Sequence, residues 1–573
     1  MKNYIIMLMA ILLMVTCFAV PPVARAVTPP SDGCYPNYTT AEGCNALAIL
    51  STGTGNTAVG WYSLASVDTN GFNTGVGAGT LASNIADANT AVGTAAMLLN
   101  ASGFQNVANG YEALLYNTSG SYNDAVGAFA LINNVDGSFN NAFGNEALST
   151  NKHASNNTAI GDLALAYNDN TGHNLASFNT AVGAQALYTN TDGSSNTGVG
   201  FQALYNNVDG SFNTAFGNLA LFENIDAGNN TAIGYLALSN NDVTDQSMAN
   251  YNTAVGAQAL LYNADGNSNT AIGSQTLYNN ANGNFNTASG YQALFENIFA
   301  GNNTAIGYLA LSNNDVTGHN LAYYNTATGT QALFHNTDGT SNTAMGWQAL
   351  YNNAGGNRNT ATGSKALLNS VSGDFNTVIG TESGANIVTA SNVTCVGARV
   401  AGADVSSTTW IGNVYNVTPQ GGTTAPVVVS DAGQLGTLAS SERFKKDIVT
   451  MEKASETVLS LRPVTFHYKT DSKETPQFGL VAEEVAKRNP ALVVLDKEGK
   501  PYTVRYDAVN VMLLNEFLKE HRRVENQESR MHKQEAVIAQ QQKQIDALTT
   551  GLRRVSAELE LGKSAPQTAL NSQ

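Results

Sequence analysis

The sequence contains little charge, cysteine or histidine, and each shortage excludes a class of protein. Only 12 % of its 573 residues are charged, and 43 acidic residues outnumber 27 lysines and arginines. Such an acidic chain repels phosphate backbones, so nucleic acid is excluded as a partner of the middle region. The 4 cysteines and 7 histidines form no cluster with metal-ligand spacing, so neither a structural metal nor a cofactor is expected. Because 43 % of the residues are hydrophobic, disorder is excluded as well.

The N-terminus has the pattern of an export signal. Lys2 supplies positive charge, residues 5–20 form an apolar run, and Ala24-Arg25-Ala26 is a small-x-small cleavage site. The apolar run is short and ends at two prolines, which argues against a membrane anchor. We therefore expect a signal peptide over residues 1–26, export by the general secretory route to the cell surface or the medium, and no integral membrane anchor.

Three cysteines remain once the predicted signal peptide is removed. Cys34 and Cys44 lie in an N-terminal segment (residues 27–54), where an oxidising compartment would allow them to close a small disulfide loop. Cys395 is then left over, and we expect it to be buried near the end of the repeats described next.

The middle of the chain is a repeat of 17 residues with the motif Asn-Thr-Ala-Val-Gly. Most steps between motifs are 17 residues, and three are 22 residues. The motifs begin at Asn56, Asn73, Asn89, Asn106, Asn123, Asn140, Asn157, Asn179, Asn196, Asn213, Asn230, Asn252, Asn269, Asn286, Asn303, Asn325, Asn342, Asn359 and Asn376.

Each unit holds two short apolar pieces separated by glycine and closed by turn residues, as in residues 196–212. Neither piece is long enough for an ordinary helix, and one unit cannot bury its own apolar face, so a stacked parallel β-solenoid is predicted. The motif asparagine and a second one eleven residues later (Asn207 in this unit) are expected to stack as interior ladders. The branched Thr and Val are expected to face inward and the small Ala outward.

These repeats resemble the head repeats of trimeric autotransporter adhesins, whose usual form is "NSVAIG". The likeness covers residues 55–400 and implies a left-handed parallel β-roll in each of three chains packed side by side. It also implies an adhesive role, with a host-surface, matrix or glycan ligand left open.

Side chains of the kinds that catalyse reactions or bind ligands are scattered through the solenoid. His153, His173, His319 and His335 are interpreted as solvated loop residues. Aromatic residues recur after the Ala-Leu piece, as at Tyr205, Phe222 and Tyr278, and are interpreted as packing residues or surface spacers rather than a carbohydrate platform.

Composition changes near residue 420, after a connector over residues 401–432. Of the 27 lysines and arginines only six precede residue 440, which leaves 21 in the last part. A small α+β domain is predicted, with strands at 464–469, 478–480 and 502–505 and a helix at 481–488. A longer helix is expected to start near residue 507.

The long helix carries one apolar residue every seventh position. One apolar seam with polar partner positions is typical of a parallel oligomeric coiled coil, predicted over residues 507–556 and followed by a flexible tail over 557–573. A homotrimer would match the symmetry that the head repeats imply. The seam consists of Phe517, Val524, Met531, Ile538, Ile545 and Leu552.

Four blocks of the C-terminal part resemble the intramolecular chaperone, or auto-processing, domain of phage endosialidases and tail spikes. They are "SSERFKKDI", "LRPVTFHYK", "FGLVAEEV" and "YTVRYDAVNVMLLNEFLKE". The resemblance places this domain at residues 433–520. It implies assistance to trimerisation, then a single self-cleavage with Ser440 as nucleophile and Lys445 as base. The family often has Ser-Asp where this chain has Ser440-Ser441.

A serine–lysine pair is chemically reasonable only in a suitable environment. The lysine must be a neutral amine, which requires desolvation or neighbouring cations such as Arg443 and Lys446. We therefore expect an exported trimeric adhesin-like fibre that acts once as a serine autopeptidase. The alternatives are an adhesive fibre that retains an inactive trimerisation domain, and a phage-type tail fibre.

Overall fold

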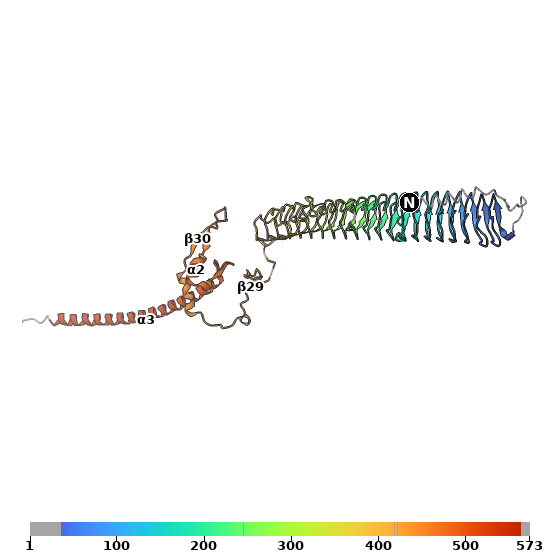
Figure 1. Ribbon diagram of the computed structural model, residues 1–573. Coiled ribbons are helices and arrows are strands. Elements are labelled where there is room, and N and C mark those ends of the chain that lie inside the picture. The colour runs from blue at the N-terminus through green and yellow to red at the C-terminus, as the bar shows by residue number, and fades with distance from the viewer. Residues whose placement is uncertain (1–35, 245, 418, 421, 563–573) are drawn as a thin grey trace, which may run out of the picture. The chain divides into compact units, whose positions relative to one another are not determined.

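The computed structural model describes residues 36–562 apart from residues 245, 418 and 421. The predicted signal peptide and Cys34 lie outside the described residues, so the disulfide to the exposed Cys44 stays a prediction. The chain divides into two compact units, Met1–Thr418 and Pro419–Gln573. The first consists of short strands, and the second combines strands with helices (Figure 1).

The first unit is a parallel β-solenoid in which each coil contributes one strand to a 22-stranded sheet (Figure 1). Successive strands pair in register, as Thr197 with Thr214 and Val199 with Phe216. This confirms the predicted fold class. The strands are β1 (Thr40–Glu42), β2 (Thr57–Val59), β3 (Thr74–Val76), β4 (Thr90–Val92), β5 (Val107–Asn109), β6 (Asp124–Val126), β7 (Asn141–Phe143), β8 (Thr158–Ile160), β9 (Thr180–Val182), β10 (Thr197–Val199), β11 (Thr214–Phe216), β13 (Thr231–Ile233), β15 (Thr253–Val255), β17 (Thr270–Ile272), β18 (Thr287–Ser289), β19 (Thr304–Ile306), β21 (Thr326–Thr328), β23 (Thr343–Met345), β24 (Thr360–Thr362), β25 (Thr377–Ile379), β26 (Thr394–Val396) and β27 (Thr409–Ile411).

The solenoid extends beyond the predicted range of residues 55–400 at both ends. The first strand, β1, and the last, β27, have the sequences TAE and TWI, which depart from the repeated motif. Terminal repeats of solenoids are commonly atypical because one of their faces has no neighbouring coil. A second, smaller ladder follows the Ala-Leu pieces; it comprises β12 (Glu223–Asn224), β14 (Asn240–Asn241), β16 (Tyr262–Asn263), β20 (Asn313–Asn314) and β22 (His335–Asn336).

The strands place alanine inside the coil and the branched residues outside, so the predicted inward direction of Thr and Val is wrong. In β13, Ala232 is fully buried, Thr231 is half-buried and Ile233 is 42 % exposed. The rest of the core comes from the second apolar piece, where Ala237 and Leu238 are fully buried. Because a 17-residue coil encloses little space, a leucine from the turn fills it and leaves room for one methyl group on the strand.

Asparagine ladders run through the interior, as predicted. The Asn207 Nδ2 donates to Asn190 Oδ1 in the preceding coil at 3.0 Å and to the Gly210 carbonyl at 2.7 Å. Its Oδ1 accepts from Asn224 Nδ2 in the next coil at 2.8 Å. The motif asparagines form a parallel ladder, in which Asn213 N donates to Asn196 Oδ1 at 2.9 Å. These amides satisfy backbone groups at the corners that no strand pairs.

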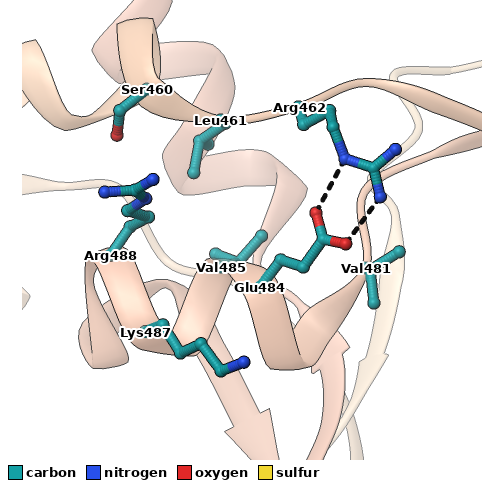
Figure 2. A pocket seen from close by; sticks show the side chains of 8 residues that line it. All are labelled: Ser460, Leu461, Arg462, Val481, Glu484, Val485, Lys487 and Arg488. Atoms are coloured by element: carbon teal, nitrogen blue, oxygen red, sulfur yellow. Dashed lines mark hydrogen bonds and ion pairs between the residues drawn. The ribbon is translucent and has the colours of Figure 1, made fainter.

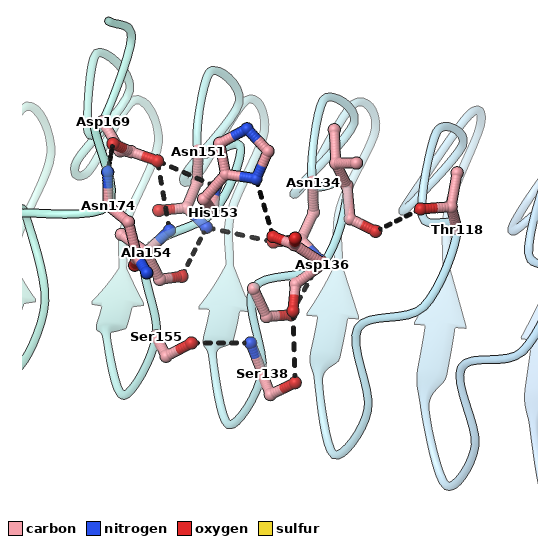
Figure 3. A network of polar contacts seen from close by, with 12 residues as sticks. Thr118, Asn134, Asp136, Ser138, Asn151, His153, Ala154, Ser155, Asp169 and Asn174 are labelled. Carbon is pink, nitrogen blue, oxygen red and sulfur yellow. Dashed lines mark hydrogen bonds and ion pairs between the residues drawn. The ribbon is translucent and has the colours of Figure 1, made fainter. Parts of the chain in front are cut away.

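The three longer coils carry five extra residues as loops anchored by a buried aspartate. Asp169 is fully buried, and its carboxylate accepts from the backbone N–H groups of His153, Ala154 and Asn174 at 2.8, 3.1 and 2.9 Å (Figure 3). Asp315 makes the equivalent contacts in the third of these coils. The loops are therefore fixed to the preceding coil.

The second unit contains the elements predicted from sequence, with small shifts at their ends. Its strands form three antiparallel pairs, and a short helix and a long helix accompany them. The elements are β28 (Val427–Val429), β29 (Leu435–Thr437), η2 (Glu442–Phe444), η3 (Glu452–Ser460), β30 (Val464–Phe466), β31 (Gln477–Gly479), α2 (Ala482–Arg488), η4 (Pro490–Leu492), β32 (Val493–Leu495), β33 (Pro501–Val504) and α3 (Tyr506–Leu561). Five buried residues make its core: Val458, Val485, Leu492, Val504 and Val509.

The long helix α3 leaves its apolar seam open to solvent within one chain. Phe517 is 67 % exposed, Ile538 61 % and Leu552 69 %. Over its 56 residues α3 buries only Val509. A helix of this length with an uncovered heptad seam is typical of one strand of a coiled coil. Among the described residues, α3 and the other helices include none that is apolar over a membrane-spanning length.

Candidate functional site

The predicted serine–lysine pair flanks the single turn η2: Ser440 lies between the β28–β29 hairpin and this turn, and Lys445 directly follows it. Lys445 Nζ is 3.2 Å from Ser440 Oγ, which is hydrogen-bond distance. This is the nucleophile-to-base distance that acyl transfer requires. The structure therefore brings together the two residues that the resemblance selected.

The turn η2 explains how two residues five positions apart meet. The Phe444 N–H donates to the Ser441 carbonyl at 3.0 Å, and the Lys445 N–H donates to the Glu442 carbonyl at 2.9 Å. This tight turn reverses the chain and returns Lys445 toward Ser440. The Arg443 guanidinium lies 4.7 Å from the centre of the Phe444 ring, a cation–π contact that orients both side chains.

The pair is open to solvent in one chain. Ser440 and Lys445 are both exposed, as are all residues from 440 to 450. Water around the ammonium group favours the charged lysine, which cannot accept a proton. The geometry of the dyad is thus present within one chain, whereas the desolvation that a lysine base requires is not.

A second serine–lysine contact, which sequence reasoning missed, joins η3 to α3. Ser455 is fully buried and donates to Glu516 Oε1, while Asn515 Nδ2 and Lys519 Nζ approach Ser455 Oγ at 2.7 and 3.3 Å. Lys519 also pairs with Glu516 at 2.6 Å, and hydrogen bonds from Lys519 and then Ser455 lower the pKa of the Glu516 carboxyl. Because the Glu516 carboxylate accepts from both Ser455 and Lys519, the cluster fixes η3 to α3.

A shallow pocket separates two of the family-like blocks (Figure 2). Arg462 donates to both Glu484 carboxylate oxygens, with Nε at 3.1 Å and Nη2 at 2.6 Å. This bidentate pair raises the pKa of Arg462 and lowers the pKa of Glu484. It also ties the block before β30 to helix α2. Neither Ser440 nor Lys445 lines this pocket, whose lining is Ser460, Leu461, Arg462, Val481, Glu484, Val485, Lys487 and Arg488.

A tyrosine joins the third block to the fourth. The Leu480 N–H, directly after β31, donates to the Tyr506 hydroxyl at 2.9 Å, and Tyr506 is the first residue of α3. The three later blocks that carry the resemblance therefore contact each other in one folded body.

The histidines of the solenoid make isolated contacts with carboxylates. His173 Nδ1 lies 3.0 Å from Asp192, which raises the pKa of the imidazole, and His153 Nδ1 lies 2.7 Å from Asp136 (Figure 3). His335 lies in strand β22 and not in a loop, and burial lowers its pKa. Within the described ranges no three His, Cys, Asp or Glu side chains gather in a way that could hold a metal ion.

The predicted packing role of the aromatic residues after Ala-Leu is confirmed. Tyr188 stacks on Tyr205 with ring centres 4.9 Å apart, and Tyr205 stacks on Phe222 at 5.0 Å. One ring lies on the next from coil to coil, and this mutual cover leaves each of them only half-exposed.

Comparison with known proteins gives one match. Residues 440–494 match the family model described as chaperone of endosialidase. The matched stretch begins at Ser440 and ends in β32, so it contains the dyad, the Arg462–Glu484 pair and α2. No curated protein matches the chain. No solved structure matches it either.

Proposed function

We propose that the chain is an exported homotrimeric surface fibre with an adhesin-like solenoid. Its C-terminal unit acts as an intramolecular chaperone that aligns three chains and then separates itself by cleavage at Ser440. The observation that carries this proposal is the family match, which begins at the serine that lies 3.2 Å from Lys445.

The cleavage chemistry follows from the dyad. The Lys445 amine accepts the hydroxyl proton as Ser440 Oγ attacks the carbonyl carbon of the adjoining peptide bond. The C–N bond breaks, the leaving amine takes the proton back from the lysine, and an ester remains on Oγ. Water then hydrolyses the ester and restores the serine. Each chain is cut once, and other proteins are not digested.

Exposure of the dyad explains why cleavage would wait for assembly. In one chain the Lys445 side chain is exposed, so the desolvation that a lysine base requires is missing. Cover from neighbouring chains would remove that water and leave a neutral amine, and backbone N–H groups nearby would hold the oxyanion. Cleavage would thus mark a completed trimer, after which dissociation is hard to reverse.

The repeats supply the reason for a trimerising domain. All strands of the solenoid follow one register, with Thr opposite Thr from coil to coil through most of its length. Three such chains could align one coil out of step at little cost in free energy. A coiled coil along α3 that forms first would set the register, and its open seam at Phe517, Ile538 and Leu552 is the surface available for it.

The test compares wild type with Ser440→Ala, Lys445→Ala and the neighbouring Ser441→Ala as matched control. We expect wild type and Ser441→Ala to yield a fragment that ends beside Ser440 by intact mass, while the other two variants stay whole. If all four chains stay whole and trimeric, the C-terminal unit assembles the fibre without cutting it, and the proposed chemistry is refuted.

The family description also favours a second candidate, a phage-type tail fibre. The two differ in export. Expression with and without residues 1–26 separates them, because a surface fibre requires this segment to reach the medium or the cell surface, whereas a tail fibre assembles equally well without it.

A further inference from the structure

Five aromatic side chains form a widely spaced row along one corner of the solenoid. Each is the residue directly before a motif asparagine, and each is strongly exposed, between 60 % and 64 %. A row of exposed apolar side chains, unlike a single one, can mark an interaction site. The row consists of Phe178, Phe212, Tyr251, Phe285 and Tyr324.

The row occupies every second coil. Its members precede β9, β11, β15, β18 and β21, and the strand order is β9–β10–β11–β13–β15–β17–β18–β19–β21. The coils between them carry small polar residues at the same position: Ser195, Asn229, Ser268 and Asn302. Ring and polar residue therefore alternate over nine coils.

The fold does not require these rings. The corner has a left-handed backbone in every coil, with φ of 61° at Phe212, 58° at Ser195 and 61° at Asn229. Asparagine adopts this conformation more readily than an aromatic residue does. The rings also gain little from packing, because most of their surface stays in water. Their presence in alternate coils thus points to a ligand.

The spacing identifies the class of ligand. Neighbouring strands lie about 4.8 Å apart, so two coils advance about 9.6 Å, and an extended β-1,4-linked glycan repeats its disaccharide about every 10 Å. Over four steps the mismatch grows to about 2 Å, which rotation of the side chains absorbs. We propose that this row binds extended β-1,4-linked polysaccharide, with one ring stacked on every second sugar.

The flanking residues suit sugar hydroxyls. The position before the corner residue carries a hydroxyl or amide side chain both in coils with a ring, as at Ser211 and Asn284, and in the coils between them, as at Ser194 and Asn267. They are half-buried and ordered by contacts between coils, as where Ser194 N donates to Ser211 Oγ at 2.9 Å and Asn267 N donates to Asn284 Oδ1 at 2.7 Å. An uncharged glycan presents hydroxyl groups and apolar sugar faces. A line of fixed polar groups beside a line of rings can bind both.

A second copy of the solenoid has another surface available to it. The third residue of each strand offers a better contact surface for another copy of the chain. Consecutive coils carry exposed apolar side chains at this position, as at Phe216 and Ile233, which are 45 % and 42 % exposed. The glycan inference deepens the adhesive role proposed above and rests on it.

The test measures depletion of the full-length protein by microcrystalline cellulose and by chitin, with amylose as the α-1,4-linked comparison. The row variant is Phe212→Ser, Tyr251→Asn and Phe285→Ser, which installs the residues of the intervening coils and so preserves the corner. The matched control is Phe201→Ser with Tyr235→Asn, because these exposed aromatics directly follow the motif glycine and so lie at another position of the coil. Several rings act together, so we expect binding at least about tenfold weaker in the row variant and unchanged in the control.

Three results would overturn the inference. The wild type is depleted by neither cellulose nor chitin; the control variant loses as much binding as the row variant; or the row variant changes the molar mass in solution, which would make the row a contact between copies. Molar mass and cleavage beside Ser440 report on the proposed function separately, so lost glycan binding with both intact refutes the glycan inference alone.

Discussion

The two units of this chain differ in how they bury their apolar side chains. The solenoid has one continuous core that extends from Ala46 to Cys395, and interior asparagines such as Asn207 bond from coil to coil. The hydrophobic core of the C-terminal unit has five buried residues in the part of the chain that the structure describes, and the 56 residues of α3 contribute one of them. A unit that completes its own core can exist as a single chain, whereas a unit with an open apolar seam needs copies of itself.

This difference indicates which of the two units sets the alignment of the chains. The solenoid is stabilised coil by coil, so it tolerates any alignment with another chain and carries no information on register. The coiled-coil helix is stabilised by other chains and does carry that information. We first predict how substitutions in the solenoid change its stability, and then how charges in the seam of α3 change assembly.

The largest effect on the solenoid is expected from its glycine corner. Gly217 has φ of +141°, and a Cβ there would lie 2.4 Å from the Gly234 carbonyl oxygen of the next coil. Gly217→Ala must push the coils apart, so we expect a loss of at least about 3 kcal/mol in unfolding free energy. Denaturant unfolding measures it. The control is Gly355→Ala, where a Cβ meets no atom within 4 Å, and equal losses in both variants would contradict the account.

The next effect comes from the asparagine ladder. Asn207→Ala removes the hydrogen bonds that this side chain makes with the Gly210 carbonyl and with the amides of Asn190 and Asn224, while the Gly210 carbonyl keeps its bond from Asn196 Nδ2. We expect a loss of about 2–4 kcal/mol, seen as faster hydrogen exchange in the adjoining coils and not in remote ones. Asn206→Ala is the control, because Asn206 is half-buried and bonds the Glu223 side chain. A loss below that of the control would show that the ladder is not stabilising.

The smallest effect is a pH dependence at the end of the solenoid. Asp404 accepts from three backbone N–H groups, of Val388, Thr389 and Ala390, which lower its pKa to about 2. Because the pKa is depressed on folding, the stabilisation is complete above pH ~4 and is lost as the pH falls through ~2; after discounting for exposure it is about 1 kcal/mol. We expect Asp404→Asn to lower the stability at pH 7 by this amount and to have no effect at pH 2.

Fluorescence of Trp410 in β27 reports on these last coils. The measurement uses a chain in which the other two tryptophans, Trp61 and Trp347, are replaced by Phe. A stability difference between this chain and its Asp404→Asn variant that stays constant from pH 7 to pH 2 would show that the carboxylate charge is not responsible.

The repeat made most of the fold predictable. Position-specific recurrence of Asn, Gly and Leu indicated the coil length, the ladders and the corners, because every coil imposes the same steric demands. The inward direction of Thr and Val was predicted wrongly, since β-branched residues usually mark a core, whereas the narrow interior of most coils holds alanine there. The outermost coils were missed because their strands, TAE and TWI, depart from the motif.

Only the part of the candidate site whose residues are close together in the sequence was predictable. Ser440 and Lys445 are five residues apart, and one turn brings them together. Ser455 and Glu516 are 61 residues apart, and no pattern in the sequence relates the start of η3 to a helix face. The exposure of the dyad was also not predictable, because burial depends on which chains surround it.

The most direct test of the account is the molar mass of the uncut chain in solution. Ser440→Ala keeps the chain whole, and light scattering then gives its mass with and without Met531→Asp and Ile538→Asp, which place charges in the seam of α3. The account predicts three chain masses for Ser440→Ala and one for the seam variant, with the solenoid still folded in both. A single chain mass for Ser440→Ala, or a trimer that survives the seam charges, would contradict the claim that α3 assembles the fibre.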